Sequence, residues 1–177
     1  MVTISNFVYY DLTDDVRQHM MNEVNMDMNK DMLYLSSNFN DYGRKVYPEL
    51  LLESIKTGNG YTLQIALNDN NCFLTIKPKK GGGIQKVESN AAQKISQNEF
   101  NRYYVRGVCL KAITEDIENV EIYRAKESTR ARLESERKIG NLISAKALLE
   151  DLRNSIGNDP QILPEIGSGL SIKLPKK

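Results

Sequence analysis

The sequence predicts an α+β fold, with a helix-rich body, a few short strands, a flexible basic loop and an extended C-terminal arm. Apolar residues recur at helical spacing in several separate segments, which predicts helices. Glycine, proline and lysine crowd the stretch 77–90, and residues 158–177 combine prolines and glycines with a short alternating segment. We therefore expect one body over residues 1–157, with its basic loop at about 77–90, and an arm over residues 158–177.

The first helix is expected to begin after Thr13, whose hydroxyl can accept a hydrogen bond from an unpaired backbone N–H. Two aspartates follow and face the positive end of the helix dipole. The helix then carries one apolar stripe, with a residue at every fourth position: Val16, Met20, Val24 and Met28. Five of the six methionines lie between residues 20 and 32, and we expect core packing rather than an adaptable binding face.

Two further helices are expected before the basic loop. Pro48 suits a first helical turn and Gly58 a left-handed position after the last one, which predicts a helix over residues 48–57. A second helix is expected over residues 61–69, and a strand over 72–77 that ends at Pro78. The segment "PKKGGGIQK" follows, and its composition predicts a flexible basic loop.

A central amphipathic helix is expected from about residue 97. Ser96 and Glu99 fit the capping box, in which each side chain bonds a backbone N–H of the first turn. Arg102 and Arg106 lie one turn apart and are expected to face solvent or a neighbouring subunit. The apolar face consists of Phe100, Tyr104, Val108 and Ala112.

The last third of the chain predicts a strand, a helix and the arm. The segment "NVEIYRAK" favours a strand, and Ser144 is placed to cap a last helix that Gly157 ends. In the arm, three apolar residues alternate with polar ones in the period of a half-buried strand: Leu170, Ile172 and Leu174. We expect these three residues to contact the sheet edge of a neighbouring copy.

The overall charge of +1, from 24 basic and 23 acidic residues, selects no class of partner. Its distribution is uneven, because residues 1–31 hold six acidic residues against two basic ones, and residues 77–86 hold four lysines and no acidic residue. These segments suit head-to-tail contact between copies, or they are two solvated faces. Two irregularly spaced cysteines predict neither disulfides nor a zinc site, and we expect no secretion leader and no membrane span.

The sequence predicts no catalytic, cofactor-binding or metal-ligating residue, and hence no enzyme and no small-molecule substrate. His19 is the only histidine, and no nucleophile pattern surrounds it. The triple glycine lacks the spacing of a phosphate-binding loop. A metal-dependent nuclease needs an acid and a lysine on one strand face, whereas Glu121 and Lys126 are five residues apart and fall on opposite faces. An enzyme of unrecognised type remains an alternative.

Nucleic-acid binding is a stronger alternative. Residues 124–138 hold six basic residues against three acidic ones, and the segment 77–86 adds four lysines. Tyr103, between two arginines, could stack on a base while they contact phosphates. The chain would then be a DNA-binding accessory protein that uses residues 77–86 and 124–138. The candidate DNA or subunit contacts are Lys77, Lys79, Lys80, Lys86, Arg102, Arg106, Arg130 and Arg132.

Several segments together resemble small virion structural proteins of tailed bacteriophages. These segments are "YPELLLESIKTG", "EFNRYYVRGVCLKAI", "VEIYRAK", "ESERKIG", "LLEDLR" and "SGLSIKLP", within residues 47–175. The resemblance implies a component of the head, portal ring or head–tail connector that acts by oligomerising. Its partners would be copies of itself, other virion proteins and packaged DNA. Its location would be the virion, after assembly in the host cytoplasm.

Overall fold

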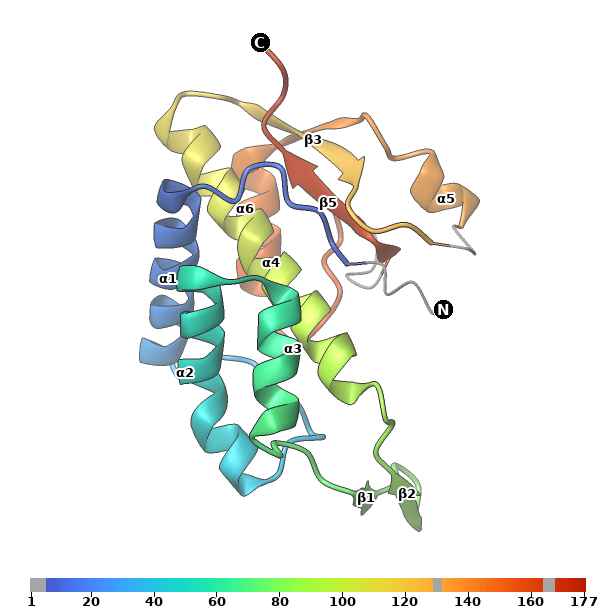
Figure 1. Cartoon of the computed structure of the whole chain (residues 1–177). Coiled ribbons are helices and arrows are strands. Elements are labelled where there is room, and N and C mark those ends of the chain that lie inside the picture. The colour runs from blue at the N-terminus through green and yellow to red at the C-terminus, as the bar shows by residue number, and fades with distance from the viewer. Residues whose placement is uncertain (1–5, 129–131, 164–167) are drawn as a thin grey trace. The chain divides into compact units, whose positions relative to one another are not determined.

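The computed structural model describes residues 6–128, 132–163 and 168–177, and over these residues the fold is α+β (Figure 1). The chain forms two compact units: unit 1 comprises Met1–Leu33 and Asn101–Lys177, and unit 2 comprises Tyr34–Phe100. The expected division into a body of residues 1–157 and an arm of residues 158–177 differs from this one. The expected body is divided because residues 34–100 form a compact unit by themselves, and the expected arm is not separate because the end of the chain pairs with a strand of unit 1.

The described elements are short, apart from three longer helices. In chain order they are α1 (Asp14–Asn29), α2 (Asp41–Thr57), α3 (Gly60–Asp69), β1 (Ile76–Pro78), β2 (Ile84–Lys86), α4 (Ala91–Thr114), β3 (Asn119–Arg124), α5 (Leu133–Glu136), β4 (Leu142–Ser144), α6 (Ala145–Asn154) and β5 (Leu170–Lys173). Residues 91–100 of α4 belong to unit 2, and residues 101–114 belong to unit 1.

Helix α1 confirms the predicted stripe over most of its length. Val16, Met20 and Val24 are fully buried. Met28 is 39% exposed and Met32 is 47% exposed, so the prediction of core packing is wrong for these two methionines. Thr13 precedes the helix in extended backbone, but its hydroxyl donates to the Asp15 carboxylate and caps no backbone amide.

In unit 2, α2 and α3 pack against each other through residues fully buried in both helices (Figure 1). Helix α2 begins at Asp41 rather than Pro48, because the Asn40 side chain accepts a hydrogen bond from the Gly43 N–H at 2.7 Å. Gly58 ends α2 with φ −134°, so the expected left-handed conformation is not adopted. Helix α3 confirms the prediction for residues 61–69. It begins one residue earlier, at Gly60, directly after a capping box formed by Asn59 and Thr62.

The predicted strand and flexible loop after α3 form a β-hairpin. Strands β1 and β2 pair antiparallel, with Lys77 opposite Gln85 and Pro78 opposite Ile84. The turn runs through Gly81, Gly82 and Gly83, which all have positive φ, a conformation that glycine adopts without steric cost. The expected strand over residues 72–77 is therefore confined to its last two residues and Pro78.

Helix α4 begins at Ala91, six residues before the predicted start. Ser96 lies inside the helix, fully buried, and its hydroxyl has no hydrogen-bond partner among the described residues, so the predicted capping box does not exist. Every side chain from Glu99 to Cys109 is buried. The helix is therefore not amphipathic here, because its polar side chains have internal partners.

Unit 1 contains a sheet with strand order β4-β3-β5, in which both pairs are antiparallel. Ile122 on β3 is opposite Ile172 on β5, and Arg124 is opposite Leu170. The N-terminal segment also reaches β3, where the Val8 N–H donates to the Ala125 carbonyl at 2.7 Å. Helix α6 follows β4 and confirms the predicted cap, since the Ser144 hydroxyl accepts from the Ala147 N–H at 3.2 Å.

Candidate functional site

Unit 1 contains a charged cluster, which we define as Glu23 and Asp27 on α1, Tyr103 and Arg106 on α4, and Arg153 on α6. The residues on α1 and α4 are buried, whereas the Arg153 side chain is 37% exposed. The Arg106 guanidinium donates to both Asp27 carboxylate oxygens, at 2.6 and 3.0 Å, and to Glu23 at 3.2 Å. The Tyr103 hydroxyl donates to Asp27 at 2.6 Å. Arg153 donates to the two oxygens of Glu23 at 2.9 and 3.0 Å. The cluster thereby joins α1, α4 and α6.

The charges of the cluster balance, with two carboxylates and two guanidinium groups. Arg106 is fully buried, and Glu23 and Asp27 are each 2% exposed. Burial disfavours the charged form of Arg106, but the hydrogen bonds to Asp27 and the attraction of both carboxylates outweigh it and raise the pKa of Arg106. Removing one partner from such a buried ion pair leaves an uncompensated charge, which is strongly destabilising.

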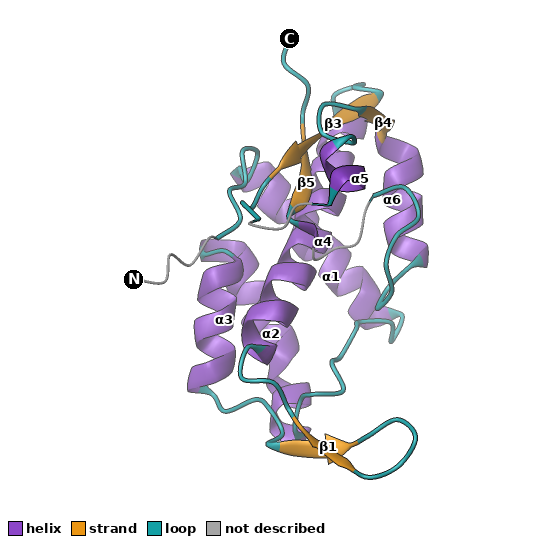
Figure 2. Cartoon of the chain, turned by 90° about the vertical axis from the view of Figure 1, so that its right-hand side faces the viewer, coloured by secondary structure: helices purple, strands orange, loops and turns teal. Residues whose placement is uncertain are grey.

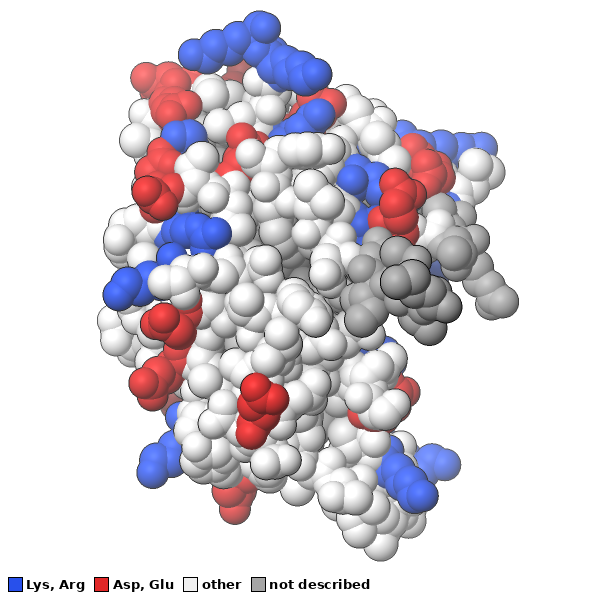
Figure 3. All heavy atoms as spheres, in the orientation of Figure 1, with Lys and Arg blue, Asp and Glu red and all other residues white. Residues whose placement is uncertain are grey.

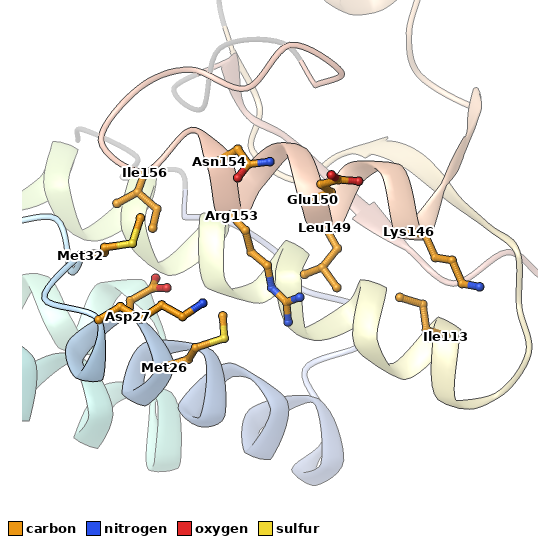
Figure 4. Close-up of a pocket in the computed structure, with 11 residues that line it drawn as sticks. Met26, Asp27, Met32, Ile113, Lys146, Leu149, Glu150, Arg153, Asn154 and Ile156 are labelled. Carbon is orange, nitrogen blue, oxygen red and sulfur yellow. The ribbon is translucent and has the colours of Figure 1, made fainter.

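A pocket of about 540 Å³ lies beside this cluster in unit 1 (Figure 4). Five apolar, three basic and two acidic side chains line it, together with Asn154. Arg153 points from α6 toward α1 and forms part of the wall, where its two hydrogen bonds to Glu23 hold it (Figure 4). The pocket therefore offers charges of both signs, and its Arg153 and Asp27 already bind partners within the protein.

Arg102 and Arg106 do not face solvent or a neighbour, and this prediction is wrong. Arg102 is 2% exposed and donates to the backbone carbonyls of Ser155 and Asn158, at 3.3 and 2.6 Å. Both arginines therefore stabilise unit 1 from within. The segment 1–31 likewise presents fewer acidic side chains at the surface than expected, because Glu23 and Asp27 are buried in the cluster.

The hairpin of unit 2 carries the exposed lysines among the predicted contacts. Lys79, Lys80 and Lys86 are exposed, whereas Lys77 is half-buried and its ammonium donates to the side chains of Ser37 and Asn38. Figures 1 and 2 show the hairpin extending beyond the ends of α2 and α3. Its side chains are therefore accessible to another molecule.

The two faces of the hairpin differ in chemistry. Residues opposite each other in an antiparallel pair share a face, as do alternate residues of one strand. Lys77 and Gln85 form one face of the hairpin. The hydrogen bonds of Lys77 to residues 37 and 38 show that this face is turned toward the rest of unit 2. Ile76, Pro78, Ile84 and Lys86 form the other, which we call the outer face. Ile76 is 52% exposed and Ile84 is 71% exposed, so the outer face is apolar and uncovered.

The remaining predicted contacts differ in their outcomes. Arg132 is exposed just before α5, and Arg130 lies outside the described residues. Leu170 is 3% exposed and Ile172 is fully buried in the sheet of the same chain, so the arm is an internal strand and is not free for a neighbour. Leu174 is half-buried, and its N–H donates to the Asp11 carboxylate at 2.9 Å.

The outer face was missed in the sequence, although a signal for it was present. Two isoleucines flank a run of glycines and lysines, at positions 76 and 84, and alternation in a hairpin places both on one side. The sequence pattern predicts a strand for Ile76 and a flexible basic loop for Ile84, and so does not place the two isoleucines on one face.

Among residues 6–128, 132–163 and 168–177, no group of three or more histidine, cysteine or acidic side chains could hold a metal ion. Cys72 and Cys109 are buried and free, and burial raises the pKa of both thiols. Over the same part of the chain, no helix combines the length and apolar character that crossing a bilayer requires.

No family model matches the sequence, and neither the curated proteins nor the solved structures include a match to the chain.

Proposed function

We propose that the chain is an oligomerising structural component of a tailed-bacteriophage virion, of the head–tail connector, ring or capsid-associated kind, and that its hairpin makes a subunit contact. The observation that carries the proposal is the uncovered outer face, with Ile76 and Ile84 more than half exposed. The resemblance of the sequence to phage virion proteins supplies the class of assembly.

The physical argument concerns the stability of the hairpin. An isolated two-stranded hairpin is marginally stable in water, and one with three-residue strands has few ladder hydrogen bonds. Fully burying an isoleucine side chain stabilises by about 1.5–3 kcal/mol, and a partner can gain the share that corresponds to the surface still exposed on Ile76 and Ile84. A partner that covers the outer face therefore both gains binding energy and fixes the hairpin.

The second candidate function is that of a DNA-binding accessory protein, and the exposed Lys79, Lys80 and Lys86 favour it. Each lysine that neutralises a phosphate releases a counterion, so the affinity would fall steeply with salt. The outer face argues for a protein partner instead, because phosphate contact uses the lysines and leaves the isoleucines in water.

The experiment compares self-association and DNA binding of the same variants. Native mass spectrometry and light scattering of the wild-type chain should show oligomers whose fraction rises with concentration. Ile76→Ser with Ile84→Ser should reduce this association, while Leu133→Ser, at a residue 65% exposed in unit 1, is the matched control. A wild-type monomer at every concentration would contradict the proposal.

The DNA alternative has its own readout. Lys79→Gln, Lys80→Gln and Lys86→Gln should weaken binding to duplex DNA and reduce its salt dependence if the hairpin contacts phosphates. Lys77 is left in place because it bonds to Ser37 and Asn38. Salt-dependent DNA binding by a chain that does not self-associate would favour the alternative.

A further inference from the structure

Helix α3 carries a second uncovered apolar surface, which we call the α3 stripe: Tyr61, Ile65 and Asp69. These residues recur at every fourth position and so lie on one side of the helix. Tyr61 is 40% exposed and Ile65 is 42% exposed, whereas Leu63 and Leu67, between them in sequence, are fully buried. The helix thus packs with one side and leaves an apolar stripe on the other.

The α3 stripe ends in negative charge. Asp69 is the only charged residue of α3 and is exposed, and no basic residue lies in the last turn. The carbonyl end of a helix carries a partial negative charge, to which Asp69 adds a full one. The space-filling view shows few charged side chains over α3 and basic side chains on the hairpin (Figures 1 and 3).

The outer face and the α3 stripe match in chemistry and in spacing. Ile76 and Ile84 are diagonal neighbours across the hairpin, which sets them about 7–8 Å apart. Tyr61 and Ile65 are four residues apart on a helix, a rise of about 6 Å. An isoleucine pair can therefore lie against a tyrosine–isoleucine pair, with the hairpin lysines next to the acidic end of α3.

We infer that the outer face of one copy docks on the α3 stripe of a second copy of this chain. This inference rests on the proposed function, in which the hairpin makes a subunit contact, and it identifies the partner surface. The two surfaces differ, so each copy gives its hairpin to one neighbour and offers its α3 to another. Such head-to-tail contacts close into rings when the rotation between copies permits, and extend into filaments when it does not.

The test uses two variants that each block one half of the contact. Ile84→Asp places a charge in the outer face, and Ile65→Asp places one in the α3 stripe. Each variant alone should be monomeric at concentrations where the wild type associates, with a dissociation constant for self-association at least tenfold higher. The reason is that every contact needs one intact copy of each surface. Their mixture should form a one-to-one dimer and nothing larger, because an intact hairpin from one variant meets an intact α3 from the other. Native mass spectrometry resolves the two species when one variant is isotopically labelled.

The control and the contrary outcomes separate this inference from the proposed function. Leu133→Asp changes an exposed leucine outside both surfaces and should associate like the wild type, and thermal unfolding of all variants checks that each is folded. Loss of association in Ile84→Asp but not in Ile65→Asp would overturn the α3 partner and leave the proposed function standing. A mixture that stays monomeric would also overturn it. A wild-type chain that never associates would overturn both.

Discussion

Arg106 on α4 donates two hydrogen bonds, of 2.6 and 3.0 Å, to the Asp27 carboxylate on α1, and neither residue is more than 2% exposed. The pair is two-pronged, because two guanidinium nitrogens meet two carboxylate oxygens, and this geometry is among the strongest that side chains form. The adjoining Glu23 binds both Arg106 and Arg153. The arrangement explains how two charged residues of the central helix can lie inside unit 1.

Replacing Arg106 by methionine should destabilise the protein by about 3–5 kcal/mol, because it leaves Asp27 buried without its charged partner. Adding Asp27→Asn should restore part of the loss, since the unpaired charge is then removed. Urea unfolding of the single and double variants measures both effects. Lys94→Met, which breaks the exposed pair with Glu88, is the control and should leave the midpoint unchanged.

The sequence predicts the elements of this fold better than it predicts what their polar residues do. The four-residue spacing of Val16, Met20 and Val24 predicts helix α1, and the cap at Ser144 predicts the start of α6. Both predictions succeed because each signal lies within a few residues of sequence. The partners of Arg102 and Arg106 come from α1 and from the segment after α6, far away in sequence. Two arginines one turn apart resemble an exposed face unless those partners are known.

For a similar reason, the exposed lysines of the hairpin could be predicted from the sequence, whereas its outer face could not. The lysines of residues 77–86 identify the hairpin as a surface feature, and Lys79, Lys80 and Lys86 are exposed as expected. The outer face depends on the register of β1 with β2, which places Ile76 and Ile84 on the side away from Lys77. The arm was misjudged because the pairing of β5 with β3 joins residues about fifty positions apart in sequence, and no local pattern gives that pairing.

Alkaline pH should unfold unit 1 through its buried tyrosines. Burial raises the pKa of Tyr9 and Tyr104, and raises that of Tyr123 to about 12. An unfolded tyrosine has a pKa of about 10, so the folded state holds the proton more tightly. The contribution of Tyr123 to stability is complete below pH 10 and is lost as the pH rises from 10 to 12, and the contributions of Tyr9 and Tyr104 also begin to fall above pH 10. Urea unfolding across this window should show a falling free energy.

The matching variant tests the cause of this pH dependence. Tyr123→Phe removes one titrating hydroxyl, together with its 2.5 Å hydrogen bond to the Val8 carbonyl, and should flatten the decline while lowering the stability at pH 8. Tyr61→Phe, on the exposed stripe of α3, is the control. An unchanged slope in Tyr123→Phe would assign the decline to other groups.

The strand β5 should be required for the stability of unit 1. Ile172 is fully buried opposite Ile122, so Ile172→Ala should cost about 2–5 kcal/mol. Leu133→Ala, at a leucine that is 65% exposed and lies outside both proposed contact surfaces, should change the free energy of unfolding by no more than about 0.5 kcal/mol. Equal effects in the two variants would mean that the pairing of β5 with β3 does not contribute to the stability of unit 1.

Replacing either of two glycines of unit 2 by alanine should change the free energy of unfolding, but in opposite directions. A Cβ at Gly43 would stand 2.1 Å from the backbone oxygen of Cys72 and 2.9 Å from its Cβ, so the start of α2 would have to move. That movement would disturb the cap at Asn40, whose backbone N–H donates to the same Cys72 oxygen at 2.9 Å. Overpacking of this kind costs about 1–3 kcal/mol.

Gly60 is the matched control for Gly43. A Cβ there would meet its nearest atoms at 3.4 Å, an ordinary contact, so Gly60→Ala should stabilise the protein by about 0.4–1 kcal/mol by lowering the conformational entropy of the unfolded chain. The two variants remove the same freedom from the unfolded chain, and the difference between their free energies of unfolding therefore isolates the close approach of α2 to Cys72. Similar stabilisation by both substitutions would show that the approach at Gly43 is not a constraint on the fold.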